Sequence, residues 1–236
     1  MSLSVIIPVY NEKENLRATL LTTLEYLHSH VDQFELICVD DGSTDGSLDI
    51  LAEFAKSDPK FQLVRHTNNS GKGEAIRTGI AKAVYLQCLF LDADFSTHIK
   101  EWDKFAPAFE AGHKVVTASR HLKDSKITVP QSFIRRTLGS GYRILSRILF
   151  GLKISDFNCG FKAYRTDLAK KVYSQTRMDD WTFDVEVFCI LKSMGYSVHE
   201  IPVTWEHKDK HSNIKPISTA FKTLKSLFTL KRRFAK

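Results

Sequence analysis

Short apolar runs alternate with segments of helical periodicity through the first half of this chain. The pattern predicts strands over residues 4–9, 34–39, 61–65 and 86–91, and helices over 14–30, 47–56 and 74–84. Strands that alternate with helices predict an α/β fold, in which a mostly parallel sheet carries helices on both faces. The carboxyl ends of such strands open into one crevice, where sheets of this kind bind their ligands.

The second half of the chain is less regular. It predicts strands over residues 113–118, 160–164 and 196–205, helices over 133–152 and 183–194, a mobile loop over 121–132 and a polar loop over 206–215. Pro202 lacks an N–H group, so we expect its strand to lie at a sheet edge or to end there. Pro216 suits the first turn of a last helix. Since no repeat or linker is evident, we expect one domain over residues 1–213 and a C-terminal helix over 214–236.

Composition narrows the class of protein. The four cysteines form no Cys-x-x-Cys pair, which is typical of reduced core residues in a cytosolic protein. The N-terminus has no basic leader, and the longest apolar stretch, 83–91, is far shorter than a membrane span. The formal net charge of +7 favours partners that carry phosphate, unless the basic residues only solubilise the surface.

Acidic residues follow two of the predicted strands. Asp92-Ala93-Asp94 closes the last strand of the first half, and two carboxylates there suit a divalent cation shared with substrate phosphates. Asp40-Asp41 closes the second strand and can accept hydrogen bonds from a base or ribose. The alternative for this second pair is a turn in which Thr44 or Asp45 caps the next helix.

The ends of the first and third strands add polar groups to the same crevice. Tyr10-Asn11-Glu12 can hold a base and ribose, although Asn11 could equally cap the next helix, with Glu14 closing a capping box. Gly71-Lys72-Gly73 supplies a flexible backbone and a cation. Its spacing differs from an NTPase phosphate loop, and no Gly-x-Gly-x-x-Gly follows the first strand, which argues against a dinucleotide site.

Together these motifs resemble the inverting family 2 glycosyltransferases of the GT-A fold. The polyprenyl-phosphate branch, which includes dolichyl-phosphate glucosyltransferases and mannose synthases, is the most similar, and the resemblance covers roughly residues 3–213. The motifs that carry it are Pro8-Val9-Tyr10-Asn11-Glu12, Asp40-Asp41-Gly42-Ser43-Thr44-Asp45, Gly71-Lys72-Gly73-Glu74-Ala75-Ile76-Arg77, Asp92-Ala93-Asp94, Asp156-Phe157-Asn158-Cys159-Gly160-Phe161-Lys162-Ala163-Tyr164 and Trp181-Thr182-Phe183-Asp184-Val185-Glu186.

The resemblance implies an activity. A hexose would pass from a nucleotide-diphosphate sugar to a polyprenyl or dolichyl phosphate, with inversion and with Mg²⁺ or Mn²⁺ on the diphosphate. UDP-glucose is favoured over GDP-mannose, because Ser96 stands where mannose synthases usually carry Gln. The segment Glu206-His207-Lys208-Asp209-Lys210-His211 departs from the usual family ending. Alternatives are a saccharide or protein acceptor, a sugar-1-phosphate nucleotidyltransferase, and a non-catalytic nucleotide-sugar-binding module.

The resemblance also assigns roles to residues. It divides the domain into a nucleotide-sugar-binding half, 1–112, and an acceptor half, 113–213. Asp94 is expected to bind the metal, and Asp92 the metal or ribose. Asp184 and Glu186 are expected to orient the acceptor or bind the metal, unless they only favour the start of their helix. The residues expected to bind the donor are Pro8, Tyr10, Asn11, Glu12, Asp40, Asp41, Lys72, Gly73, Arg77, Asp92 and Ala93.

The predicted helix from residue 133 carries a basic stripe. At about 100° per residue, Arg136, Ser140, Arg143 and Arg147 share one side, and the other side is apolar. A basic stripe of one sign indicates an anionic partner, although an amphipathic surface helix is the alternative. By resemblance, Arg136 and Ser140 serve the lipid phosphate, and Arg120 is a second candidate. A phosphate is already anionic at neutral pH, so its attack on the anomeric carbon needs cations more than a base.

The last predicted helix has one apolar side with lysines and arginines along it. The apolar residues are Ile217, Ala220, Phe221, Leu224, Leu227 and Phe228, and the basic ones are Lys222, Lys225, Arg232 and Lys236. This pattern is typical of a helix that lies on a membrane surface. We therefore expect a peripheral protein at the cytoplasmic face of a membrane, with no nucleic-acid partner. Packing on the domain, on a second copy or on a membrane protein is the alternative.

Overall fold

A seven-stranded sheet forms the centre of the protein. The computed structural model describes the backbone of residues 2–130, 132–208 and 216–234, and the side chains of all of these except 216–222. The strand order is β3-β2-β1-β4-β7-β5-β8, and only β7 runs antiparallel to its neighbours. The strands are β1 Ser2–Val9, β2 Gln33–Asp40, β3 Phe61–Arg65, β4 Gln87–Leu91, β5 Val115–Ser119, β7 Phe161–Arg165 and β8 His199–Pro202. The α/β fold with a mostly parallel sheet is confirmed.

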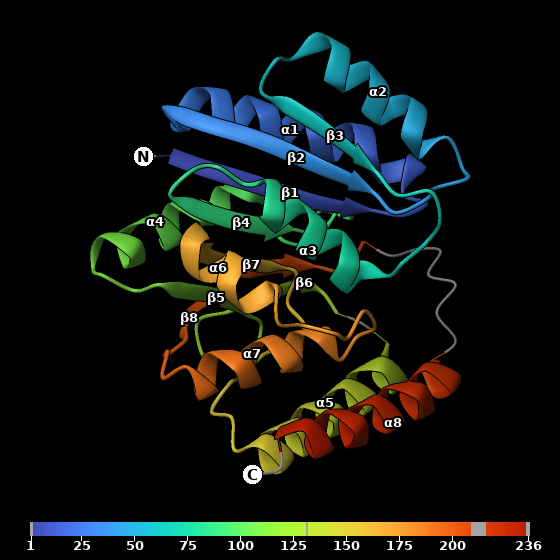
Figure 1. Cartoon of the computed structure of the whole chain (residues 1–236), viewed down its shortest axis with the longest axis vertical. Helices are drawn as coiled ribbons and strands as arrows, with labels where there is room; N and C mark the ends of the chain where they lie inside the picture. Colours follow the sequence, from blue (N-terminus) through green and yellow to red (C-terminus); the bar gives the residue numbers. More distant parts are fainter. Residues whose placement is uncertain (1, 131, 209–215, 235–236) are drawn as a thin grey trace.

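Helices cover both faces of the sheet, and each face has its own apolar core (Figure 1). One face carries α1 (Lys13–His30), α2 (Ser47–Ser57), a short 3-10 turn (Ile99–Glu101) and α4 (Trp102–Glu110). The other carries α3 (Lys72–Lys82), α6 (Thr166–Tyr173) and α7 (Phe183–Ser193). The sheet is therefore buried on both sides, as expected of strands that read as apolar runs.

The order of the strands reverses beside β1. The chain moves outward from β1 through β2 to β3, and then returns to place β4 on the other side of β1. In open α/β sheets, ligands bind outside the carboxyl ends of the strands at such a reversal. The acidic strand ends of the sequence lie at this point.

Some elements differ from those expected. The loop predicted over 121–132 contains a short strand, β6 (Lys126–Val129), which pairs with β9 (Thr204–Glu206) in a second small sheet. The strand expected over 196–205 is split, because β8 ends at Pro202 and β9 leaves the main sheet. Pro202 does lie in an edge strand, as predicted. Helices α4 and α6 were not expected, and most of the polar loop predicted over 206–215 lies outside the described residues.

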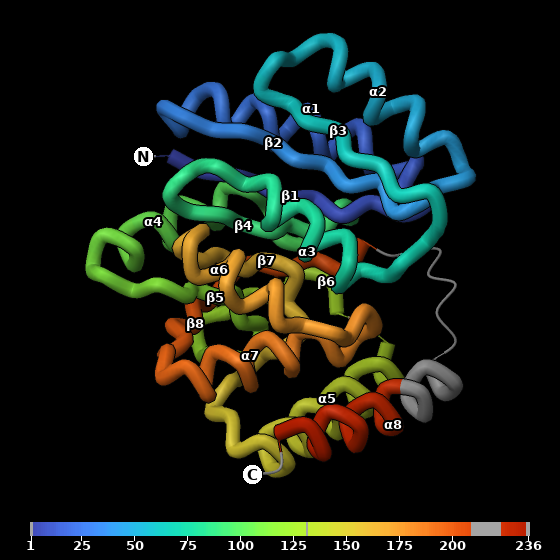
Figure 2. Tube along the Cα trace, in the orientation of Figure 1, coloured from blue at the N-terminus to red at the C-terminus, as the bar shows by residue number. Residues whose placement is uncertain are grey.

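Two long helices, α5 (Phe133–Phe150) and α8 (Pro216–Phe234), lie side by side beyond α7 (Figure 2). The predicted C-terminal helix is therefore present and begins at Pro216, as expected. It does not stand apart from the domain, because Leu227 and Leu230 are fully buried in the core that α3, α6 and α7 share. No described helix is long and apolar enough to cross a membrane.

Candidate active site

The parallel register brings the polar strand ends together. Val9 at the end of β1 pairs with Asp40 at the end of β2, and Ile6 pairs with Phe90 near the end of β4. The segments that follow these strands, at Tyr10, Asp41 and Asp92, therefore leave the sheet at one edge. The strand register alone therefore brings three of the segments that carry predicted donor-binding groups to one edge of the sheet.

Asp92 forms an ion pair with Lys72 across this edge. Lys72 Nζ lies 2.5 Å from Asp92 Oδ1, and about a quarter of each side chain is exposed. Burial by itself would lower the pKa of Lys72, but Asp92, with Asp184 and Asp94 nearby, raises it. The sequence predicted a cation at Lys72, and the structure adds that its side chain forms an ion pair with Asp92.

Asp92 also requires a glycine behind it. Gly160 accepts a hydrogen bond from the Asp92 amide at 3.0 Å, and a β-carbon on Gly160 would fall 1.8 Å from Asp92 Oδ2. No side chain fits in that space. The motif around Gly160 was noted in the sequence, but this function of its glycine was not predicted.

Asp94 completes the acidic pair. Its Oδ1 accepts a hydrogen bond of 2.9 Å from the Ser96 amide, across a tight turn in which Phe95 adopts the left-handed φ of +57°. Burial and the neighbouring charge of Asp92 raise the pKa of Asp94, and only part of this is offset by Ser96 and Lys72. Two carboxylates crowded in this way would be stabilised by a bound cation.

A second ion pair lies behind the first one. Lys162 Nζ, on β7, is 2.6 Å from Asp184 Oδ1 at the start of α7, and both side chains are buried. Burial raises the pKa of Asp184, while Lys162 and Lys72 oppose that shift. Asp184 thus lies within electrostatic reach of Lys72, but its charge is balanced by Lys162. Lys162 was not predicted as a site residue, because a lysine inside a strand gives no local signal.

The two aspartates after β2 differ in their partners. Asp41 accepts hydrogen bonds from the amides of Ser70 and Gly71 and from His66 Nδ1, so both of its oxygens are engaged. It fixes the loop that leads to Lys72, which argues against direct contact with a donor. Asp40 is also buried, and its Oδ2 has no hydrogen-bond partner among the described residues.

The segment after β1 is open to solvent. Tyr10 is 46% exposed and Pro8 is half-buried, so both can meet a ligand. Asn11 adopts a left-handed φ of +54° and its Oδ1 accepts from the Thr44 amide, which ties this segment to the loop after β2. The alternative of a capping box formed by Asn11 and Glu14 is wrong, because Glu12 occupies the cap position of α1 and its side chain does not cap the helix.

The cap of α2 also differs from the expected one. Gly46, and not Thr44 or Asp45, occupies the cap position, with a left-handed φ of +94°. Asp45 still supports the first turn, because its Oδ1 accepts from the Ser47 amide at 2.9 Å and its Oδ2 from the Lys13 amide at 3.0 Å. The loop after β2 therefore binds the first turns of both α1 and α2.

Arg120, which directly follows β5, forms an ion pair with Asp156. Its Nε and Nη2 donate to the two oxygens of Asp156 at 2.7 and 2.8 Å, and its backbone amide adds a third bond of 3.0 Å. Burial alone would raise the pKa of Asp156, but Arg120 holds it well below its usual range. The ring of Trp205 from β9 lies 5.2 Å from the guanidinium. Arg120 is thus in the crevice region, although its strongest contacts are within the protein.

Two predicted site residues, Arg77 and Glu186, bind other protein groups. Arg77 bonds Thr176 and Asp179 and also pairs with Glu74, so its guanidinium faces protein partners. Glu186 is fully buried: it accepts from two backbone amides and from an arginine of α8. These placements argue against donor contact by Arg77 and against acceptor or metal contact by Glu186.

The basic stripe of α5 is present. Arg136 is exposed on the first turns, Ser140 is half-buried, and Arg143 follows two turns after Arg136. Burial lowers the pKa of His121, which follows Arg120; Asp156 opposes this shift, and Arg143 and Arg120 add to it. The apolar side of α5, opposite the basic stripe, is only partly buried. Leu145 and Leu149 pack against the core, whereas Ile134 and Ile148 are exposed.

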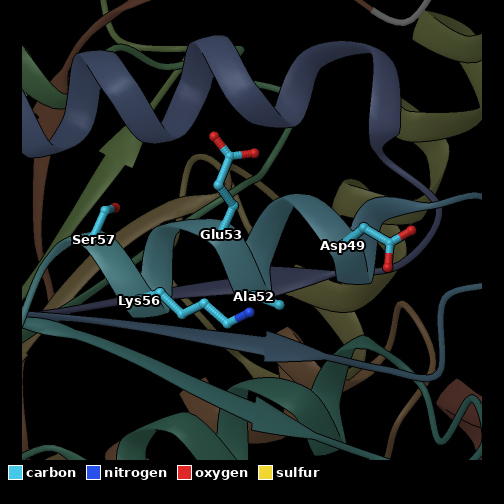
Figure 3. Close-up of a pocket in the computed structure, with 5 residues that line it drawn as sticks. All are labelled: Asp49, Ala52, Glu53, Lys56 and Ser57. Carbon is cyan, nitrogen blue, oxygen red and sulfur yellow. The ribbon is translucent and has the colours of Figure 1, made fainter.

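A pocket elsewhere on the surface has a different character. It has a volume of about 430 Å³ and lies along α2, with side chains that all come from this helix (Figure 3). Its lining residues are Asp49, Ala52, Glu53, Lys56 and Ser57. None of them follows a strand end, so the crevice beside β1 and β4 is the stronger candidate.

Comparison with known proteins agrees with this geometry. The model of glycosyl transferase family 2 matches residues 4–173. A dolichyl-phosphate beta-glucosyltransferase from Dictyostelium discoideum is 29% identical over 98% of this chain and 74% of its own length. One from Trichomonas vaginalis is 33% identical over 86% of this chain and 65% of its own length. The chain thus spans 74% of the length of the first relative and 65% of the length of the second.

Solved structures share the fold. Glucosyl-3-phosphoglycerate synthase from Mycobacterium tuberculosis, in complex with Mn²⁺, UDP and glucosyl-3-phosphoglycerate, matches with a TM-score of 0.72 at 16% identity. The match covers 97% of this chain and 79% of that one. At this identity the likeness concerns the fold alone. With the family match over most of its length, the chain belongs to glycosyl transferase family 2 and is a glycosyltransferase of the GT-A fold.

Proposed function

We propose that this protein transfers glucose from UDP-glucose to a polyprenyl phosphate of the dolichyl type, with inversion. The observation that carries the proposal is the charge pattern at the strand reversal, where Lys72 faces Asp92 and Asp94. The relatives named above are dolichyl-phosphate beta-glucosyltransferases, which favours this acceptor and this sugar. GDP-mannose is the second candidate donor.

The acidic pair fits a divalent cation. Mg²⁺ is usually held by one or two carboxylates together with substrate phosphates, and this strand end offers Asp92 and Asp94. The raised pKa of Asp94 reflects crowded negative charge, which a cation would relieve. Bound Mg²⁺ or Mn²⁺ would supply charge neutralisation to the departing nucleotide diphosphate. The solved structure named above contains Mn²⁺ and UDP in its own site.

The residues of the chain divide the remaining tasks. Lys72 would bind the diphosphate in exchange for part of its contact with Asp92. We expect the exposed Tyr10 to meet the base or ribose, whereas Asp40 Oδ2 is fully buried and lies 3.9 Å from Arg65 Nε. The acceptor phosphate is already anionic, so it attacks the anomeric carbon without a strong base. Arg136, Ser140 and Arg143 are the groups that would bring this second anion in.

A saccharide acceptor is less well supported. A hydroxyl needs a carboxylate that is free to accept its proton. Asp184 is buried against Lys162, and Glu186 is buried against α8. The available basic stripe of α5 instead favours an acceptor that carries phosphate.

A donor and acceptor screen tests the proposal. We expect the protein to transfer label from UDP-glucose to a short polyprenyl phosphate, faster than from GDP-mannose, and to stop in excess chelator. The product, measured by thin-layer chromatography, should lose glucose in mild acid as a phosphate glycoside does. Transfer to a free sugar or a prenol that lacks phosphate, at equal rate, would overturn the acceptor assignment.

Arg136 provides a test of the acceptor phosphate. We expect Arg136→Ala to raise the KM for the polyprenyl phosphate while leaving the KM for the donor unchanged. Loss of a charge-assisted contact with phosphate should weaken binding by about 1.5–3 kcal/mol. Arg147→Ala, which removes an exposed charge from the last turn of the same helix, is the matched control. Equal effects of the two variants would contradict a specific phosphate contact.

A lipid-borne acceptor also needs a membrane surface, and we propose that α5 and α8 contact the cytoplasmic face of an anionic bilayer. Large apolar side chains of both helices are exposed: Phe133 by 80%, Ile134 by 61%, Ile148 by 74% and Phe228 by 52%. Exposed basic residues accompany them, and each adds about 1 kcal/mol near an anionic surface. Where such side chains form a continuous apolar patch, that patch typically marks a contact with a membrane or another protein.

Vesicle binding tests this contact. We expect Phe133→Ser combined with Ile148→Ser to weaken sedimentation with anionic vesicles, because the Phe133 ring and the Ile148 side chain would otherwise enter the bilayer interface. Leu21→Ser, at a position that is 55% exposed on α1, is the control for general surface hydrophobicity. If the double variant and the control sediment alike, the membrane contact lies elsewhere, or these helices bind another protein.

A further inference from the structure

Residues 175–182 form a loop between α6 and α7, which we call the bridging loop. It lies between α3, which carries Lys72, and the C-terminal helix α8. Its residues form hydrogen bonds with α3 on one side and with α8 on the other. The loop therefore connects the candidate donor site with α8.

On one side, the loop is fastened to α3. Arg77 donates to Thr176 Oγ1 at 3.0 Å and to Asp179 Oδ1 at 2.8 Å. The glycines that flank Lys72 pack directly on the loop: a β-carbon on Gly71 would lie 2.7 Å from the Asp179 carbonyl oxygen, and one on Gly73 2.6 Å from that of Met178. The backbone of Lys72 is therefore set by where this loop lies.

On the other side, the loop is fastened to α8 through Glu186. One carboxylate oxygen of this buried residue accepts from the amides of Arg177 and Met178 at 2.9 and 2.8 Å. The other oxygen is paired with Arg233 of α8. Arg233 also donates to the Gln175 carbonyl at 2.7 Å, and Ser226 of α8 bonds Asp180 at 2.6 Å.

The loop also presents one exposed aromatic ring beside the site. Trp181 is 43% exposed, and its ring centre lies 5.9 Å from Lys72 Nζ. Its carbonyl accepts from Tyr142 Oη and Asn158 Nδ2, each at 3.2 Å, so the backbone beneath the ring is held. The other two tryptophans, Trp102 and Trp205, are buried, so Trp181 is the natural reporter of this loop.

We infer that Arg233, Glu186 and Ser226 are positioning residues for the donor site, which act through the bridging loop on Lys72 and Trp181. Glu186 is fully buried, so removal of Arg233 would leave its carboxylate without a compensating charge. Loss of Arg233 should therefore release Glu186, then the amides of Arg177 and Met178, and with them the support of Lys72. The identity of the ligand rests on the proposed function, whereas the order of the loop does not.

The inference is tested with Arg233→Ala against Arg232→Ala, in the full chain and without lipid. Both remove one positive charge from adjacent positions of α8, but only Arg233 pairs with Glu186. We expect Arg233→Ala to make tryptophan fluorescence more quenchable by acrylamide and to weaken UDP binding, measured by calorimetry, by about tenfold. Arg232→Ala should leave both unchanged, and Arg233→Lys should recover part of each. Circular dichroism checks that the variants are folded.

The outcomes separate this inference from the donor assignment. If Arg233→Ala matches Arg232→Ala in both measurements, or changes quenching without changing UDP affinity, α8 does not position the donor site. If the unaltered protein binds no UDP, the donor assignment fails, and the quenching comparison still decides whether α8 orders the bridging loop. Should Arg233→Ala unfold, Ser226→Ala, which removes only the bond to Asp180, is expected to change both measurements in the same direction.

Discussion

The structure depends on how negative charge is balanced where β4 ends. Asp92 and Asp94 are one residue apart at a partly buried edge, and two carboxylates in such a place oppose each other's ionisation. The 2.5 Å ion pair from Lys72 offsets this repulsion within the protein. Gly160 leaves space for the Asp92 carboxylate, and the bridging loop fixes the helix that carries Lys72. Gly160 and the bridging loop, both in the second half of the chain, thus support the contact between Lys72 and Asp92.

The same arrangement is compatible with the exchange of ligands that we propose for this site. Lys72 and Asp92 each keep about a quarter of their side chains exposed, in contrast to Lys162 and Asp184, which are closed. A diphosphate with its cation brings both charges that the open pair needs, so binding can replace that pair without leaving a charge unbalanced. The buried pair of Lys162 and Asp184 would keep its geometry while the ligand binds. We therefore propose the partly exposed pair as part of the binding site and the buried pair as its support.

The sequence predicted those features that depend on residues close to one another along the chain. Strand ends, the acidic pair and Lys72 follow from apolar runs and from residues adjacent to them, and the register of a parallel sheet then brings them together. The partners Lys162–Asp184, Arg120–Asp156 and Arg233–Glu186 are 22, 36 and 47 residues apart, and only tertiary packing makes them meet. For the same reason Glu186 was expected in the site. Likewise, the periodicity of α5 and α8 shows which residues share a face, but not which face the domain covers.

The central claim is that Asp92, Asp94 and Lys72 form a site for a divalent cation together with a nucleotide diphosphate. Its most direct test is the affinity for UDP, measured by calorimetry with Mn²⁺ and with excess chelator, in the unaltered protein and in Asp94→Asn. Because coupling between two ligands is reciprocal, each should strengthen the binding of the other. We predict that Mn²⁺ tightens UDP binding by at least about tenfold in the unaltered protein and has little effect in Asp94→Asn. Equal UDP affinity with and without the cation, or an unchanged cation effect in Asp94→Asn, would contradict the account.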